Sequence, residues 1–173
     1  MNKVSTKKMI LAGLFTGLGI IIPIAFHTFS ISGSVFLPMH IPVLLTGLLC
    51  GWYYGLITGI IVPILSSIMT GMPPLYPVAI AMAVELATYG AVIAIVSKKT
   101  NVTISLIISM ICGRLTLGIA NVILLGLSGK SYAWSMFITG AFLTALPGIV
   151  IQLILIPIIY MFFKKSGYLE EEI

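Results

Sequence analysis

Charged side chains are scarce in this chain. Only 8% of its 173 residues are Asp, Glu, Lys or Arg, whereas 60% are hydrophobic and the mean hydropathy is +1.21. Soluble domains carry charge on about a quarter of their residues, because their surface must face water. The deficit excludes a soluble globular domain and a disordered segment. It predicts an integral membrane protein whose outer surface faces the lipid bilayer.

Cysteines and catalytic motifs are also few or missing. Cys50 and Cys112 form no CxxC pair, so we interpret them as small packing residues. The chain has no Walker-type glycine-rich loop, no HExxH, no GxSxG and no paired carboxylates. We therefore expect a protein that is not an enzyme and holds no cofactor or metal. Any active transport would draw its energy from an ion gradient or from another chain.

Apolar residues are arranged in six runs, and a transmembrane helix needs roughly 20 such residues. This pattern predicts an all-α integral membrane protein in which residues 1–173 form a single domain of six transmembrane helices. The predicted segments are 9–26, 39–50, 54–69, 76–96, 103–127 and 137–163.

Lysines orient the six segments. With six crossings, the lysine clusters before the first segment, after the fourth and after the sixth fall on one side, which the positive-inside rule makes cytoplasmic. Both termini are then cytoplasmic, and the net charge of +5 reflects topology rather than binding of nucleic acid. The outer loops become 27–38, 70–75 and 128–136, and we expect a recognition site to open outward among them. The clusters are Lys3, Lys7 and Lys8; Lys98 and Lys99; Lys164 and Lys165.

Two ionisable residues, Glu85 and Arg114, fall deep inside predicted helices, each roughly 15 Å from a helix end. Because a lone charge at that depth is costly, their opposite signs predict an ion pair between the fourth and fifth segments. The pair either only fixes helix packing or touches a polar group of a ligand. Asn121 lies two turns further out on the same helix face as Arg114, and Lys130 extends this polar path into the third outer loop.

Other polar and aromatic residues complete the candidate set. His27 and His40 flank the predicted first outer loop without an acidic or cysteine companion, so we interpret them as interface residues or ligand hydrogen-bond donors rather than metal ligands. The aromatic residues near the outer interface either form an ordinary aromatic belt or cover a ligand. The aromatic residues at this interface are Phe36, Tyr76, Tyr132 and Trp134. Tyr89 lies one turn further in from Glu85, and Gln152 adds a buried amide in the sixth segment, where it either packs or binds.

Small residues recur at four-residue spacing in the first segment. Gly13 and Gly17, beside Ala12 and Thr16, either pack inside the bundle or dock another membrane subunit. A second pair, at positions 55 and 59, is expected to serve internal packing. The prolines at positions 23, 63, 147 and 157 are expected to kink or break their helices.

The stretch FLPMHIPVLLTGLLCGWYYGLITGIIVPILSSIMTGMPPLYPVAIAMAVELATYG (36–90), together with GRLTLGIANVILLG (113–126), resembles the substrate-binding S components of energy-coupling factor (ECF) vitamin transporters. The resemblance implies a protein of the prokaryotic plasma membrane that binds a vitamin at an outward-facing pocket. It also implies docking on a membrane coupling T subunit driven by two cytosolic ATPase subunits. Docking in the family uses an Ala-x-x-x-Ala pattern in the first helix, and here Thr16 replaces the second Ala.

Among S components, the chain is most similar to the pantothenate-type group, and a carboxylate cargo suits the planar fork of Arg114. Pyridoxine-like compounds, folate precursors and cobalamin remain open as cargo. The sequence thus predicts a high-affinity vitamin-binding S component. The alternative is a stand-alone ion-coupled carrier or channel built on the Glu85–Arg114 pair, although no inverted repeat is visible.

Overall fold

The computed structural model describes residues 5–29, 33–129 and 132–166, and within them it contains helices and no strand. Six helical stretches are long and apolar enough to cross a membrane, so the prediction of six spans is confirmed. They are α1 (Thr6–Thr28); α2 (Gly33–Phe36) with α3 (His40–Cys50); α4 (Trp52–Thr70); η1 (Leu75–Ala79) with α5 (Ile80–Val96); α6 (Val102–Leu127); and α7 (Trp134–Ile138), η2 (Thr139–Leu143) and α8 (Leu146–Lys165).

Short polar and glycine signals set the helix boundaries. Ser5 caps α1 by accepting a hydrogen bond from the Lys8 backbone, and Asn101 caps α6 by accepting one from the Ile104 backbone at 2.8 Å. Gly51 separates α3 from α4 with a φ of 100°, a conformation that L side chains rarely adopt. This glycine divides the almost continuous apolar run at residues 39–69 into two antiparallel helices.

The first outer loop is shorter than predicted. Helix α1 continues to Thr28, whose hydroxyl donates to the Ile24 carbonyl inside the last turn. Residues Gly33–Phe36 then form the helical turn α2, which opens the second span. The placement of His40 at the edge of this loop is therefore wrong. The second span begins at Gly33, seven residues before His40, and His40 is buried within it.

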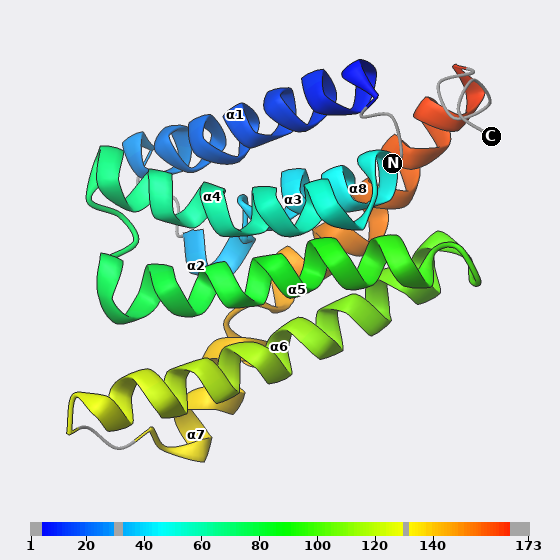
Figure 1. Cartoon of the computed structure of the whole chain (residues 1–173). Coiled ribbons are helices and arrows are strands. Elements are labelled where there is room, and N and C mark those ends of the chain that lie inside the picture. Colours follow the sequence, from blue (N-terminus) through cyan, green and yellow to red (C-terminus); the bar gives the residue numbers. More distant parts are fainter. Residues whose placement is uncertain (1–4, 30–32, 130–131, 167–173) are drawn as a thin grey trace.

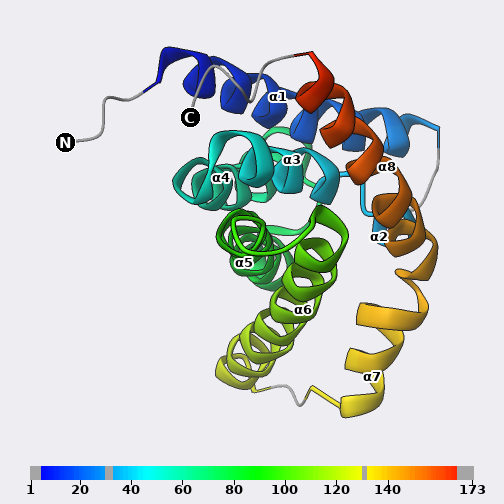
Figure 2. The ribbon, with the colours of Figure 1, turned by 90° about the vertical axis from the view of Figure 1, so that its right-hand side faces the viewer.

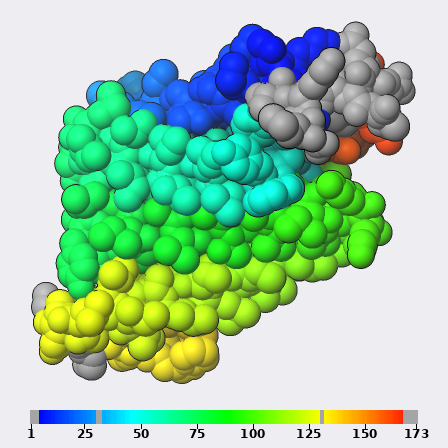
Figure 3. All heavy atoms as spheres, viewed as in Figure 1, coloured from blue at the N-terminus to red at the C-terminus, as the bar shows by residue number. Residues whose placement is uncertain are grey.

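Helices α4, α5 and α6 lie side by side in chain order, with α1 at the outer edge of α4 (Figure 1). Helix α3 lies behind α4 and also packs on α1 and α5, while α8 and α2 occupy the opposite side from α4 (Figure 2). On the face seen in Figure 3, the atoms of α1, α4, α5 and α6 form continuous bands without an opening. The hollow of the molecule is therefore on another side, between α1–α3, α5, α6 and η2.

Glycines allow the closest helix contacts. A Cβ atom added at Gly55 of α4 would lie 2.5 Å from the Gly90 carbonyl oxygen of α5 and 2.8 Å from Gly47 Cα of α3. Gly59 faces the α5 backbone in the same way, so the predicted packing role of Gly55 and Gly59 is confirmed. The backbone of α5, which carries Glu85, is thus held directly against α4.

The sixth span is broken rather than continuous. Helix α7 and the π-helical turn η2 are followed by a break at Thr144–Ala145, and Pro147 stands in the first turn of α8. The prediction of a break at Pro147 is confirmed, whereas Pro23, Pro63 and Pro157 lie inside continuous helices. In Figure 2, α7 diverges from α6 and α8 approaches α2 and α3.

Lysines gather at one end of the bundle. The start of α1, the connection between α5 and α6 and the end of α8 lie at the same end, on the right in Figure 1. The described lysines at this end are Lys7, Lys8, Lys98, Lys99, Lys164 and Lys165. The opposite end holds the connections after α1, α4 and α6, and its side chains surround the cavity described next.

Candidate ligand site

A cavity of about 670 Å³ opens among the helices at the end away from the lysines. Its wall is formed by the end of α1, by α2 and the start of α3, by the first half of α5, by the second half of α6 and by η2. The polar side chains that line it are His27, Ser34, His40, Glu85, Arg114, Asn121 and Tyr132. The volume lies in the range typical of small-molecule sites.

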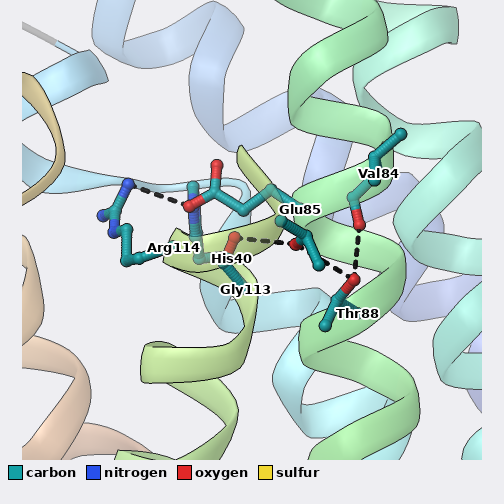
Figure 4. A network of polar contacts seen from close by, with 7 residues as sticks. His40, Val84, Glu85, Thr88, Gly113 and Arg114 are labelled. Atoms are coloured by element: carbon teal, nitrogen blue, oxygen red, sulfur yellow. Dashed lines mark hydrogen bonds and ion pairs between the residues drawn. The ribbon is translucent and has the colours of Figure 1, made fainter. Parts of the chain in front are cut away.

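The floor of the cavity holds the predicted ion pair. Arg114 Nη1 of α6 lies 2.8 Å from Glu85 Oε1 of α5, and both side chains are about 95% buried or more. The two side chains meet across the space between their helices (Figure 4). The predicted pairing is confirmed, and the pair leaves each helix with a compensated charge inside the apolar bundle.

His40 joins this pair from α3. Its Nε2 lies 3.6 Å from Glu85 Oε1, and its ring packs on Tyr89 at a centroid distance of 5.2 Å. Both ring nitrogens are buried without a hydrogen-bond partner among the described residues. Figure 4 places His40 beside Glu85, on the same side as Arg114.

Arg114 is only partly used by the protein. Its Nε and Nη2 atoms are buried and have no hydrogen-bond partner among the described residues, although the side chain lines the cavity. A buried donor without a partner is costly, so such groups in a cavity wall point to a ligand that supplies the acceptor. The free Nε–Nη2 edge is the edge that pairs a carboxylate with two parallel hydrogen bonds.

Gly113 makes room for this arrangement. A Cβ atom at this position would lie 2.6 Å from the Tyr89 ring, so a larger residue would displace that ring. The Thr116 hydroxyl of α6 donates to the Gly113 carbonyl and lies 3.2 Å from the Thr88 hydroxyl of α5. Thr88 lies on the other side of Glu85 from Arg114 (Figure 4). These contacts fix the register of the two helices that carry the ion pair.

A second polar group lies higher in the cavity. Asn121 stands seven residues after Arg114, about 10 Å along the helix. Its side chain hydrogen-bonds Tyr132, and burial raises the pKa of the Tyr132 hydroxyl above its ordinary value although that bond opposes the rise. The hydroxyl therefore stays protonated at physiological pH and can donate to a ligand.

The predicted site residues separate into three groups. The structure brings Glu85, Arg114, Asn121 and His40 to the cavity, and Tyr89 lies directly behind His40. Lys130 lies outside the described residues. The remaining three, Phe36, Tyr76 and Trp134, are not among the residues that line the cavity.

Each of these three aromatic residues has another contact. The Phe36 ring packs against Phe26 of α1 at 6.0 Å, and the Tyr76 hydroxyl donates to the Leu124 carbonyl on the outside of α6. Trp134 packs on Phe137 and is 73% exposed. These positions suit residues at the membrane interface better than residues of a ligand site.

Sequence reasoning missed the apolar wall of the cavity. Val78, Ala81 and Met82 precede Glu85 by seven, four and three residues, and Leu117 follows Arg114 by three. Helical spacing from the two charges would have found these positions. Met39, Met72 and Ala141 carried no such signal, because their place depends on how the spans pack.

The four residues of the predicted docking motif face different ways. Ala12 is 6% exposed, and the Thr16 hydroxyl donates to the Ala12 carbonyl and contacts Thr58 of α4 at 3.3 Å. A Cβ atom added at Gly13 or Gly17 would meet no atom within 4 Å. The interpretation of Gly13 and Gly17 as packing inside this bundle is therefore wrong, because their face of α1 is open.

The comparison with known families decides which class of membrane protein this is. A profile described as "ECF transporter, substrate-specific component" matches residues 7–160. The chain belongs to this family. No match to a curated protein or to a solved structure was found. As an ECF substrate-specific component, the chain is a multi-pass membrane protein and the part of a transporter that determines its substrate, in a family of transport components rather than of enzymes.

Proposed function

We propose that this substrate-specific component captures a water-soluble vitamin bearing a carboxylate in the cavity above Arg114. Pantothenate is the best candidate. The observation that carries the proposal is a buried guanidinium in the cavity wall whose Nε and Nη2 atoms have no hydrogen-bond partner among the described residues. The Glu85 carboxylate occupies only Nη1, so a ligand carboxylate binds the remaining edge without displacing it.

The rest of the cavity favours an aliphatic chain over a flat ring. Among the described residues that line it, Tyr132 is the only phenylalanine, tyrosine or tryptophan. Ring-bearing vitamins are commonly held by stacking on aromatic side chains, and such a platform is missing from this wall. The apolar lining is instead aliphatic or thioether-bearing, with Leu37, Met39, Met72, Met82 and Leu117 as its larger members.

Pantothenate matches the spacing of the polar groups. It carries a carboxylate at one end, an amide in the middle, and hydroxyl groups beside a dimethyl branch at the other end. With the carboxylate on Arg114, the hydroxyl end reaches toward Asn121 and Tyr132, about 10 Å further out. The dimethyl branch then packs on the aliphatic wall, which contributes roughly 0.8 kcal/mol per buried carbon.

Delivery is proposed to follow the mechanism of ECF transporters. The lysine-rich end faces the cytoplasm of a prokaryotic cell, so the cavity opens outward. The open face of α1 at Gly13 and Gly17 docks a membrane coupling T subunit, since small residues let helices approach closely in lipid. Two cytosolic ATPase subunits on that coupling module supply the energy.

Packing below the ion pair supports binding over conduction of ions by this chain alone. The residues between the pair and the lysine-rich end include Leu44, Ile93 and Leu106, each fully buried. Hydroxyl groups in this region donate to carbonyls of their own helices, as Ser109 does to Leu106 and Ser105 to Asn101. A polar path for an ion would need such groups free to coordinate it.

Titration of the purified protein with pantothenate tests the proposal, with isothermal calorimetry or native mass spectrometry as the readout. We expect one ligand per chain without ATP, and much weaker binding of panthenol, the analogue in which an alcohol replaces the carboxylate. Arg114→Met should weaken pantothenate binding by about 2–5 kcal/mol, a factor of roughly 30 to several thousand.

Because Arg114→Met leaves Glu85 buried without its partner, the double variant Glu85→Leu/Arg114→Met serves as the folding control. It should fold, and it should not distinguish pantothenate from panthenol. Equal affinity of the wild-type protein for the two compounds would contradict a carboxylate on Arg114.

A further inference from the structure

The free site is electrically balanced before any ligand arrives. Arg114 carries one positive charge, and Glu85, 2.8 Å away, carries one negative charge. A ligand carboxylate on the free edge of Arg114 therefore adds a second negative charge against a single positive one. Buried charges are tolerated when they are compensated, so a further positive charge is needed close by.

His40 is the group placed to supply that charge. Its Nε2 is 3.6 Å from Glu85 Oε1, its side chain is 2% exposed, and neither ring nitrogen has a hydrogen-bond partner among the described residues. A protonated imidazole donates from both nitrogens, whereas the neutral ring donates from one and accepts at the other. In the empty site, a proton on His40 would leave the balanced pair with an excess positive charge.

Titratable and charged groups reach the surroundings of His40 from several elements. Helix α5 presents Glu85 and Tyr89 to it, and α6 presents Arg114. The end of α1 contributes His27 to the cavity wall, and the segment before α7 contributes Tyr132. Helix α2 has no titratable residue, and the tyrosines and lysines of α4 and α8 lie near the lysine-rich end. Besides Arg114, the basic side chains among the described residues of the cavity wall are His40, which is buried, and His27, which is exposed.

We propose that His40 is a specificity-determining residue that takes up one proton when the ligand carboxylate binds Arg114. The site then holds the Arg114 guanidinium and the His40 imidazolium against the Glu85 and ligand carboxylates, which restores a net charge of zero. The proton comes from solvent, and no covalent bond in the ligand changes. The site thereby accommodates monoanions and disfavours dianions, which would leave one negative charge uncompensated. This inference rests on the proposed binding of a carboxylate at Arg114.

Calorimetry of the full-length protein in buffers of different ionisation enthalpy measures the proton directly. With pantothenate as the probe, we expect uptake of about one proton per ligand near pH 8, and an affinity that falls about tenfold per pH unit above neutrality. Panthenol should bind without proton uptake. Pantothenate binding without proton uptake would overturn the role of His40 and leave the proposed function intact.

Variants identify the group that receives the proton. His40→Gln keeps a polar side chain that cannot be protonated, so it should abolish proton uptake and the pH dependence of affinity. Lys98→Gln, which removes a titratable side chain at the lysine-rich end and outside the cavity wall, is the control and should retain both. Uptake that persists in His40→Gln would place the proton on Glu85 or elsewhere and overturn the assignment.

Glu85→Gln gives a second, independent measurement that does not rely on His40→Gln folding. Removing the carboxylate charge leaves one positive and one ligand negative charge, so pantothenate should bind with no proton uptake. Continued uptake of a full proton in this variant would also overturn the charge-balance argument. Melting temperatures of all variants separate misfolding from a change in binding.

The probe panel separates this inference from the choice of cargo. If pantothenate does not bind, the cargo proposal fails, and 4-aminobenzoate, nicotinate and biotin follow as carboxylate probes in the same proton measurement. A carboxylate that binds with one proton carried by His40 would support the inference for another cargo. If no carboxylate of the panel stabilises the protein against heat, both the inference and the proposed function are refuted.

Discussion

Replacing Gly55 by alanine tests whether backbone contact between α4 and its neighbours holds this bundle together. The added methyl carbon would lie 2.5 Å from the Gly90 carbonyl oxygen, 2.7 Å from the Gly90 carbonyl carbon and 2.8 Å from Gly47 Cα. Ordinary van der Waals contacts of a Cβ atom begin at 3.4 Å, so α4 and α5 must part by about 0.9 Å. No side chain can rotate away to relieve the clash, because the obstacles are backbone atoms.

The expected cost follows from that separation. Overpacking a close-packed interior costs typically 1–3 kcal/mol, and a gap of 0.5–1 Å removes a quarter to a half of the dispersion energy of each contact across it. The contact between α4 and α5 is the most extensive in the molecule, so we expect about 3 kcal/mol of destabilisation. Alanine has a helix propensity about 1 kcal/mol more favourable than that of glycine, and this gain opposes the cost of the clash.

Gly13→Ala is the matched control. Gly13 also lies inside a long helix, but a Cβ atom there meets nothing within 4 Å, so the substitution should leave stability equal or slightly increased. Unfolding in mixed micelles, followed by circular dichroism or by thermal shift, compares the two variants. A Gly55→Ala protein as stable as Gly13→Ala would refute the argument that these helices meet through their backbones.

Three further predictions concern the site and its use. Gly17→Leu should leave pantothenate affinity unchanged and abolish uptake into proteoliposomes that contain the coupling module, and full uptake would remove this face of α1 from the docking surface. Gly113→Ala should weaken pantothenate binding and lower stability by about 1–3 kcal/mol, because its Cβ would lie 2.6 Å from the Tyr89 ring; an unchanged melting temperature would show that the ring moves freely. Tyr132→Phe should weaken pantothenate binding by about 1 kcal/mol at every pH up to about 9, because the raised pKa keeps the wild-type hydroxyl protonated over this range. Calorimetry measures the two affinities, and a difference that disappears between pH 7 and 9 would contradict this.

The ion pair could be predicted from the sequence because charges are so rare in these spans. Glu85 and Arg114 had no other partner of opposite sign at matching depth, and a lone charge in hydrocarbon is costly. The six spans followed from hydropathy for a similar reason, since only long apolar helices satisfy their backbone groups in lipid. Each prediction depends on one large free-energy cost in lipid, that of an unpaired charge or that of unsatisfied backbone groups, and not on the details of packing.

The position of His40 could not be predicted in this way. Hydropathy begins the second apolar run at about residue 39, which puts this histidine at the membrane edge, whereas the turn Gly33–Phe36 extends the span outward. The turn forms because α2 packs on α8, where a Cβ atom at Gly148 would lie 2.7 Å from the Val35 carbonyl oxygen. That contact joins residues more than a hundred positions apart, and no local pattern signals it.

The aromatic residues show a second limit of sequence reasoning. In a helix that is apolar on all sides, the residue pattern does not tell a lipid-facing position from one that faces a cavity. Tyr76 lies on the outside of α6 and Tyr132 lines the cavity, although both were expected at the same outer interface. Only the packed arrangement of the spans distinguishes them.

The helices that meet through glycines and the broken sixth span differ in how closely they are packed. Helices α3, α4 and α5 meet backbone to backbone and form a packed slab that carries Glu85 and His40. The α7–η2 arm touches that slab sparingly, yet it supplies Gly140 and Ala141 to the cavity wall. We therefore expect a substrate that passes between water and the cavity to displace this arm rather than the three packed helices.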